Sequence, residues 1–140
     1  TEEMVERMIR HWDWYELGEF TVERREDGEI LGRVGLQLWD PRDWTNGKRA
    51  RLEGDVETEL GWKLGREHWG RGYASEAAAA CRDWALGNLG LTRLISLIAF
   101  QNAASVRVAE KIGERFERDV ENVPFPHRYG LWSLGERIAP

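Results

Sequence analysis

Residues 55–86 constrain the fold of this chain more than any other segment. In residues 55–64 apolar and polar side chains alternate, which predicts a strand. A loop with Gly70 and Gly72 follows, and an alanine-rich run to about Leu86 predicts a helix. A strand that leads through glycines into a helix gathers backbone N–H groups at the positive end of the helix dipole, where a phosphate can bind. The alternative is a tight turn with solvated arginines.

The remaining segments predict a mixed α/β domain. Helical spacing predicts a helix before Gly18 and another that begins at Asn102 and ends at Gly113. Asp27-Gly28 predicts a hairpin turn, and residues 40–54 predict a loop. Apolar runs predict further strands at 19–25, 30–39, 93–100, 116–120 and 129–134. The order α-β-β-β-α-β-α-β-β is typical of a mixed sheet with helices on its faces.

Composition excludes several classes of protein. The 140 residues fit one domain, and 20 Lys+Arg against 25 Asp+Glu give a net charge of −5, which argues against a nucleic-acid binder. No apolar run approaches the roughly 20 residues that span a bilayer. The single cysteine, Cys81, cannot form an internal disulfide, and no Cys/His cluster has zinc spacing. We therefore expect no metal site and a reducing, cytoplasmic compartment.

Two known phosphate-binding motifs fit the glycine loop poorly. A Walker loop ends in Gly-Lys-Ser/Thr, whereas here Gly72 is followed by Tyr73 and Ala74. A dinucleotide fingerprint needs a third glycine where Ser75 stands and an acidic residue after the next strand, which ends at 100–102 without one. Nucleotide binding is therefore a weaker interpretation of this loop.

A third match is a resemblance to a family. Three segments in the correct order resemble the GNAT superfamily of N-acetyltransferases, in particular the ribosomal-protein N-terminal acetyltransferases (the RimJ/RimL-like branch): Glu59–Trp62, Trp69–Ala77 and Asn102–Gly113. The resemblance is strongest over 55–113 and extends over 1–135. It implies a central, mostly antiparallel mixed sheet flanked by helices, in which the first strand and first helix of the fold are missing. Residues 1–140 are thus expected to form a single, N-terminally incomplete domain.

The resemblance also implies a co-substrate, acetyl-CoA. Its pyrophosphate would lie on the glycine loop and its pantetheine arm along the preceding strand. The residues implied to bind it are Trp62, Leu64, Arg66, Trp69, Gly70, Arg71, Gly72, Tyr73, Ala74 and Asn102. The acetyl group would pass directly to a primary amine, of a protein N-terminus or a small molecule, with no acyl-enzyme. Acceptor pockets in this superfamily come from variable loops, so the acceptor cannot be read from the sequence, and a homodimer is common in such families.

Two residues are candidates for the catalytic chemistry. An amine with a pKa near 8 to 10 must lose a proton before it attacks, and Glu59, on the strand under the thioester, is the first candidate base, acting through water. Glu57 on the same strand face is the reserve. Ser105, in the first turn of its helix, is the candidate to protonate the departing thiolate. The alternatives are solvated strand carboxylates and an ordinary helix-start serine. A catalytically silent CoA-binding module is the second hypothesis for the function.

Overall fold

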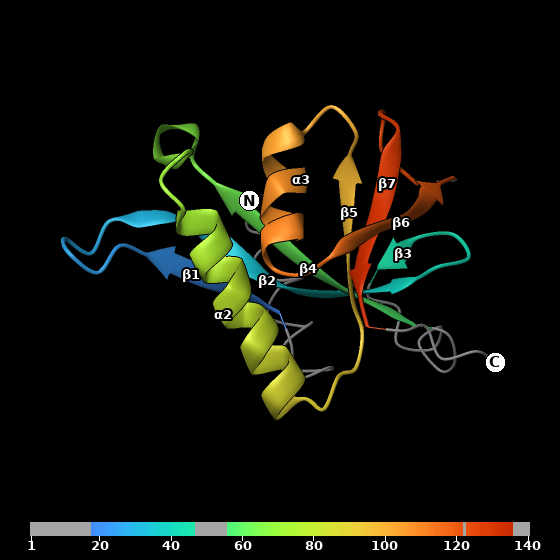
Figure 1. Cartoon of the computed structure of the whole chain (residues 1–140), viewed down its shortest axis with the longest axis horizontal. Helices are drawn as coiled ribbons and strands as arrows, with labels where there is room; N and C mark the ends of the chain where they lie inside the picture. Colours follow the sequence, from blue (N-terminus) through green and yellow to red (C-terminus); the bar gives the residue numbers. More distant parts are fainter. Residues whose placement is uncertain (1–17, 47–55, 122, 136–140) are drawn as a thin grey trace.

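The computed structural model describes residues 18–46, 56–121 and 123–135. They form a seven-stranded sheet with two α-helices and a short 3-10 helix (Figure 1). The strands are β1 (Glu19–Glu23), β2 (Ile30–Asp40), β3 (Thr45–Asn46), β4 (Glu57–Leu64), β5 (Leu94–Ala99), β6 (Arg115–Val120) and β7 (Tyr129–Leu134). The helices are η2 (Arg66–His68), α2 (Tyr73–Asn88) and α3 (Ala103–Lys111). From β1 onward the elements follow the predicted order, with the short β3 added.

The sheet opens between its two parallel strands. The strands lie in the order β1-β2-β4-β5-β7-β6, and β3 pairs with β2. All neighbouring strands are antiparallel except β4 and β5. These two are parallel and pair at one position, Glu59 with Ile95. Figure 1 shows β4 and β5 diverging towards their C-terminal ends. Backbone groups beyond that pair lack the usual ladder partners and need others.

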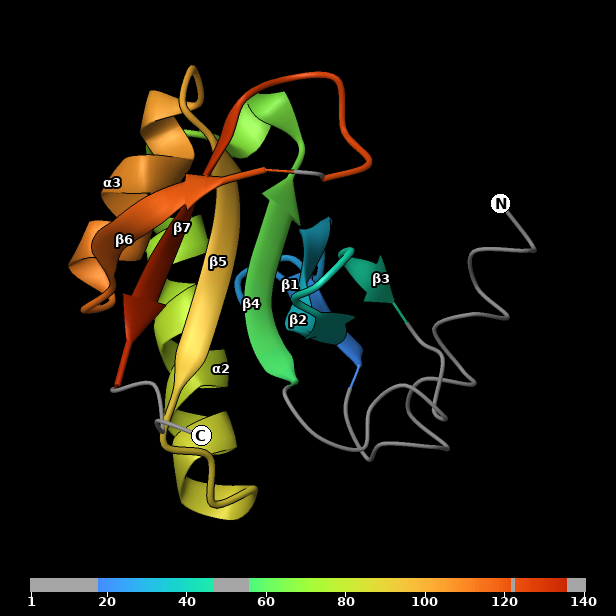
Figure 2. The ribbon, with the colours of Figure 1, turned by 90° about the vertical axis from the view of Figure 1, so that its right-hand side faces the viewer.

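Each face of the sheet has its own apolar core. The two α-helices pack on the same side of the sheet (Figure 2). The core on this side joins both helices to the strands: Val34, Leu36, Leu60, Ala78, Cys81, Ala85, Leu94 and Ile112. Side chains alternate along a strand, so Ile95 belongs to a different cluster from Leu94. That cluster consists of Trp39, Trp44, Ile95, Val120 and Leu131.

Several local predictions are confirmed. The hairpin at Asp27-Gly28 joins the antiparallel strands β1 and β2, and Gly113 has the left-handed φ (96°) expected after a helix. The loop predicted over 40–54 is wrong at Thr45–Asn46, where β3 pairs with the end of β2. A strand of two residues has no periodicity, so only its pairing could reveal it. The helix predicted before Gly18 lies outside the described residues.

Candidate active site

The glycine loop lies between the end of β4 and the start of α2. Gly70 and Gly72 have φ angles of 77° and 83°, a conformation that residues with a side chain rarely adopt. No side chain caps the helix end at Gly72, and a Cβ atom added at either glycine would meet no heavy atom within 4 Å. The loop therefore presents the positive end of α2 to open space, which suits an anion.

A cavity of about 600 Å³, here named the loop cavity, extends from this loop along β4 to α3. Most of the residues implied to bind the co-substrate line it: Trp62, Leu64, Trp69, Gly70, Gly72, Tyr73, Ala74 and Asn102. Arg66 and Arg71 are exposed and do not line it. The Arg66 guanidinium instead lies over the Trp69 ring, 5.5 Å from its centroid. The Trp69 indole N–H donates to the Leu64 carbonyl at 3.0 Å, which fixes the loop against β4.

Three cationic side chains that were not predicted also line the loop cavity: Lys63, Arg107 and Lys111. Arg107 and Lys111 are four residues apart on α3 and so share one helix face, a spacing from which they could have been found. None of the described residues that line this cavity is Asp or Glu, although the chain carries a net charge of −5. The cavity is a local positive region that favours a polyanionic ligand.

A second cavity of about 210 Å³, here named the junction cavity, lies where β4 and β5 diverge. Residues 59–62 of β4 and 96–99 of β5 line it. The two cavities meet, because four residues line both of them: Trp62, Asn102, Ser105 and Tyr129. Tyr129 was not predicted, since one tyrosine at the start of a strand has no informative spacing.

Glu59 connects three strands at the junction cavity. Its Oε1 accepts the Trp39 indole N–H at 2.9 Å, and its Oε2 accepts the Leu97 backbone N–H at 2.8 Å. Burial raises the pKa of the Glu59 carboxyl to about 7; the two hydrogen bonds oppose this rise, and the charge of Glu19 adds to it. Glu59 therefore exchanges a proton near neutral pH, as a general base must.

Glu57 has a different environment from Glu59. Its carboxylate is buried and accepts two hydrogen bonds from Arg93, at 2.9 and 2.8 Å. Arg93 also binds Glu117 at 2.9 Å, so the three residues join β4 to β6. Glu57 lines neither the loop cavity nor the junction cavity. This placement supports Glu59 rather than Glu57 as the base.

Asn102 and Ser105 lie at the start of α3, beside both cavities. Asn102 is the N-cap, because its side-chain oxygen accepts the Ser105 backbone N–H at 3.2 Å. The Ser105 hydroxyl takes no part in this cap, and its side chain is half-buried. The structure therefore leaves the Ser105 hydroxyl available to a ligand at the meeting point of the two cavities.

Other candidate chemistries find little support in the described residues. Cys81 is buried in α2, and burial raises the pKa of its thiol to about 11, which makes it a poor nucleophile. Within 18–46, 56–121 and 123–135, no group of three or more His, Cys, Asp or Glu side chains could hold a metal ion. No helix in this part of the chain is long and apolar enough to cross a membrane. The cytoplasmic location stays a prediction.

Comparisons with known proteins identify relatives of this chain. The chain is 33% identical over 120 residues to the uncharacterized protein YkkB of Bacillus subtilis (strain 168), covering 86% of this chain and 63% of that protein. It is 30% identical over 105 residues to the uncharacterized N-acetyltransferase p20 of Bacillus licheniformis, covering 73% of this chain and 52% of that protein. The chain therefore spans less than two thirds of the length of either relative.

The fold matches solved structures as well. The acetyltransferase from Agrobacterium tumefaciens str. C58 superposes with a TM-score of 0.73 and 31% identity, over 96% of this chain and 70% of that one. None of these three names identifies a branch, so the RimJ/RimL-like assignment stays a prediction. The family model described as an acetyltransferase (GNAT) domain matches residues 1–115. The chain belongs to the GNAT family of acetyltransferases, a family of acyltransferase enzymes.

Proposed function

We propose that this chain transfers an acetyl group from acetyl-CoA to a primary amine, of a protein N-terminus or a small molecule. The observation that carries the proposal is the meeting of the loop cavity and the junction cavity at Asn102 and Ser105. The loop cavity is suited to a polyanion, and the junction cavity holds a carboxyl group that exchanges a proton near pH 7. We propose residues 1–140 as a single domain for this reaction, and a homodimer stays a prediction.

The lining of the loop cavity fits CoA. The backbone from Trp69 to Ala74 would hold the pyrophosphate at the start of α2, with Arg107 and Lys111 supplying positive charge from α3. The pantetheine arm would follow β4 past Trp62 towards the junction cavity. When bound, acetyl-CoA supplies an acetyl group activated as a thioester.

The residues of the junction cavity supply the proton transfers. Glu59 takes a proton from the bound ammonium group, directly or through water, and frees the nitrogen lone pair for attack. The new carbon–nitrogen bond replaces the carbon–sulfur bond, the nitrogen gives up its second proton to solvent, and the Ser105 hydroxyl would protonate the leaving thiolate. An ammonium ion and a thioester thus yield an amide, a thiol and one proton. The serine is reprotonated from solvent.

A thiol-release assay with acetyl-CoA and a panel of amines tests this function. The panel includes peptides with free N-termini, polyamines, aminoglycosides and amino acids, and the acetylated amine is identified by mass spectrometry. We expect at least one class to release thiol in step with its own acetylation. Tight binding of acetyl-CoA without turnover of any amine would instead support the catalytically silent CoA-binding module.

A further inference from the structure

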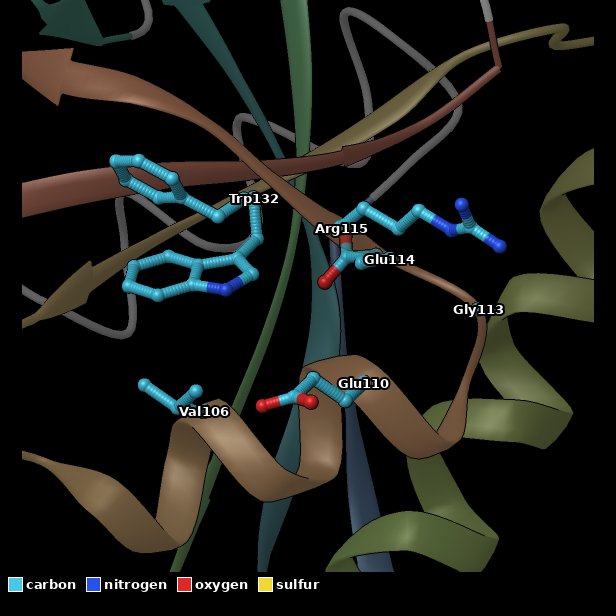
Figure 3. A pocket seen from close by; sticks show the side chains of 7 residues that line it. Val106, Glu110, Gly113, Glu114, Arg115 and Trp132 are labelled. Carbon is cyan, nitrogen blue, oxygen red and sulfur yellow. The ribbon is translucent and has the colours of Figure 1, made fainter.

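Glu114 is a buried carboxyl group to which the proposed reaction assigns no role. It follows the turn at Gly113 and immediately precedes β6, and only 1% of its surface is exposed. Its Oε2 lies 3.0 Å from the hydroxyl oxygen of Ser96, which is also buried. Its Oε1 is buried without a hydrogen-bond partner. Figure 3 shows Glu114 between α3 and β6, on the wall of a cavity of about 570 Å³.

The hydrogen bonds of Ser96 determine where the proton of this pair lies. The Ser96 oxygen is 2.6 Å from the Leu60 carbonyl oxygen and 3.0 Å from Glu114 Oε2. A hydroxyl has one proton, and a carbonyl oxygen can only accept, so the 2.6 Å contact requires the serine proton. The contact with Glu114 then needs a proton from the carboxyl group. Glu114 is therefore a neutral acid that donates to Ser96, and its free Oε1 is an uncharged oxygen, which costs far less to bury than a charge.

The charges around Glu114 favour the same neutral form. Burial raises the pKa of Glu114 to about 8; the contact with the Ser96 hydroxyl opposes this rise, and the negative charge of Glu59 adds to it. From α3, the Glu110 carboxylate points into the same cavity as Glu114, whereas the Arg115 guanidinium of β6 extends away from it (Figure 3). From α2, the Arg82 guanidinium is bound to the Ile112 carbonyl at 2.7 Å and to Asp83. Within the described residues, Glu114 forms no ion pair.

The Glu114–Ser96 pair lies next to the position where β4 and β5 diverge, because Ser96 of β5 also contacts Leu60 of β4. Beyond the register pair of Glu59 with Ile95, two side-chain bonds hold the strands together. Glu59 accepts the N–H of Leu97, and Ser96 donates to the carbonyl of Leu60. Leu60 and Glu59 both line the junction cavity. The bond from Ser96 to the Leu60 carbonyl thus holds the β4 backbone at the junction cavity. That bond requires an orientation of the Ser96 hydroxyl that the contact with Glu114 favours.

We propose that Glu114 is a positioning residue for acetyl transfer, which as the neutral acid holds the Ser96 hydroxyl on the Leu60 carbonyl and so fixes the β4 backbone of the junction cavity. This inference rests on the proposed function. Ionised Glu114 accepts the Ser96 proton instead, which releases the Leu60 carbonyl and puts a second negative charge near Glu59. Activity should therefore decline as the pH rises past about 8.

Glu114→Gln and Glu114→Leu test the proposal together. The glutamine donates an N–H to Ser96 and cannot ionise, so kcat at pH 7 should stay within about twofold of the parent value, and the alkaline decline should disappear. The leucine cannot donate, so kcat should fall about five- to tenfold at every pH, the cost of one lost hydrogen bond. Glu110→Gln, which removes a neighbouring exposed charge but keeps the ionisable Glu114, is the matched control and should keep an alkaline decline.

Two outcomes would overturn the proposal: a Glu114→Gln profile that overlays the parent profile, or a Glu114→Leu enzyme with the parental kcat. A carboxyl titration by NMR of protein labelled with ¹³C at glutamate separates this result from failure of the proposed function. We expect a signal that titrates near pH 8 and is missing in Glu114→Gln. If this signal is present but no amine is turned over, the proposed acetyl transfer is wrong, whereas Glu114 is still a neutral acid near pH 7. If the parent protein is active but the signal is missing, the positioning role of Glu114 is wrong.

Discussion

The carboxylate of Glu59 accepts the backbone N–H of Leu97 at 2.8 Å, across the opening between β4 and β5. The two strands pair at one position only, so this side chain replaces a bond that the sheet ladder would otherwise supply. The same carboxyl group lines the junction cavity. One residue thus joins the two strands at their divergence and provides the titratable group of the candidate active site.

Removing the indole donor should shift the pH profile of the reaction. Burial raises the pKa of Glu59 to about 7, and the hydrogen bond from Trp39 keeps it lower than burial alone would. In Trp39→Phe the acid limb of the kcat profile should move to higher pH by about 0.5 to 1 unit, since such a bond contributes about 1 kcal/mol. Trp44→Phe, which changes the aromatic neighbour of Trp39, is the control. If the acid limb of the kcat profile does not move in Trp39→Phe, the ionisation of Glu59 does not determine that limb.

The cations of α3 should hold the phosphates of CoA. Lys111→Glu and Arg107→Glu each place a carboxylate in a cavity whose described lining has none. The Kd for CoA, measured by calorimetry, should rise about tenfold or more, because a hydrogen bond to a charged group is worth about 1.5 to 3 kcal/mol. Arg25→Glu makes the same charge change at an exposed site outside both cavities and should leave Kd within about twofold. Equal losses in all three variants would indicate only a general charge effect.

Substitutions at Ser105 and Asn102 should affect different properties, the first mainly kcat and the second mainly stability and CoA binding. The helix cap is the Asn102 side chain, and it accepts a backbone N–H of Ser105. Ser105→Ala therefore keeps the cap, and we expect kcat to fall about ten- to a hundredfold with a stability loss below about 1 kcal/mol. Asn102→Ala should cost about 1 kcal/mol of unfolding free energy and weaken CoA binding as well. A Ser105→Ala enzyme that melts early but keeps the parental kcat would mean that the serine is structural.

The sequence was informative where a local signal determines the local structure. The glycine loop and the cap of α3 depend on neighbouring residues, and both form as predicted. The partners of Glu59 could not be predicted, because Trp39 and Leu97 are 20 and 38 residues away along the chain and meet it only through the sheet. Glu114 follows a helix-terminating glycine, a place where acidic residues are usually exposed. Only the packing of α3 against β5 buries it beside Ser96.

Stability should decrease from pH 5 to pH 8. Burial raises the folded-state pKa of Glu114 to about 8 and that of Glu59 to about 7, against 4.5 for an ordinary glutamate. Between those values the two groups bind more protons in the folded state than in the unfolded state, so their contribution to the free energy of unfolding is largest below pH 4.5 and falls as the pH rises. Each pKa unit is worth up to about 1.4 kcal/mol, and the melting temperature should drop by about 4 °C for each kcal/mol lost.

Glu114→Gln checks the sign of this effect in the same melting experiment. Its melting temperature should depend less on pH than that of the parent, and it should be the more stable protein at pH 8. Glu110→Gln replaces an exposed carboxylate but keeps Glu114, so its melting temperature should still decrease with pH. A parent protein whose melting temperature rises steadily from pH 5 to pH 8 would be incompatible with raised pKa values of Glu59 and Glu114.

The most direct test of the account is the pH dependence of kcat in the parent enzyme and in Glu59→Gln, with the best amine from the panel. The parent kcat should rise through pH 7, where Glu59 ionises. Glu59→Gln should turn over about a hundredfold more slowly or worse, the lower part of the general-base range, without that rise and with an unchanged Kd for acetyl-CoA. A Glu59→Gln enzyme with the parental kcat and the same rise through pH 7 would contradict the central claim.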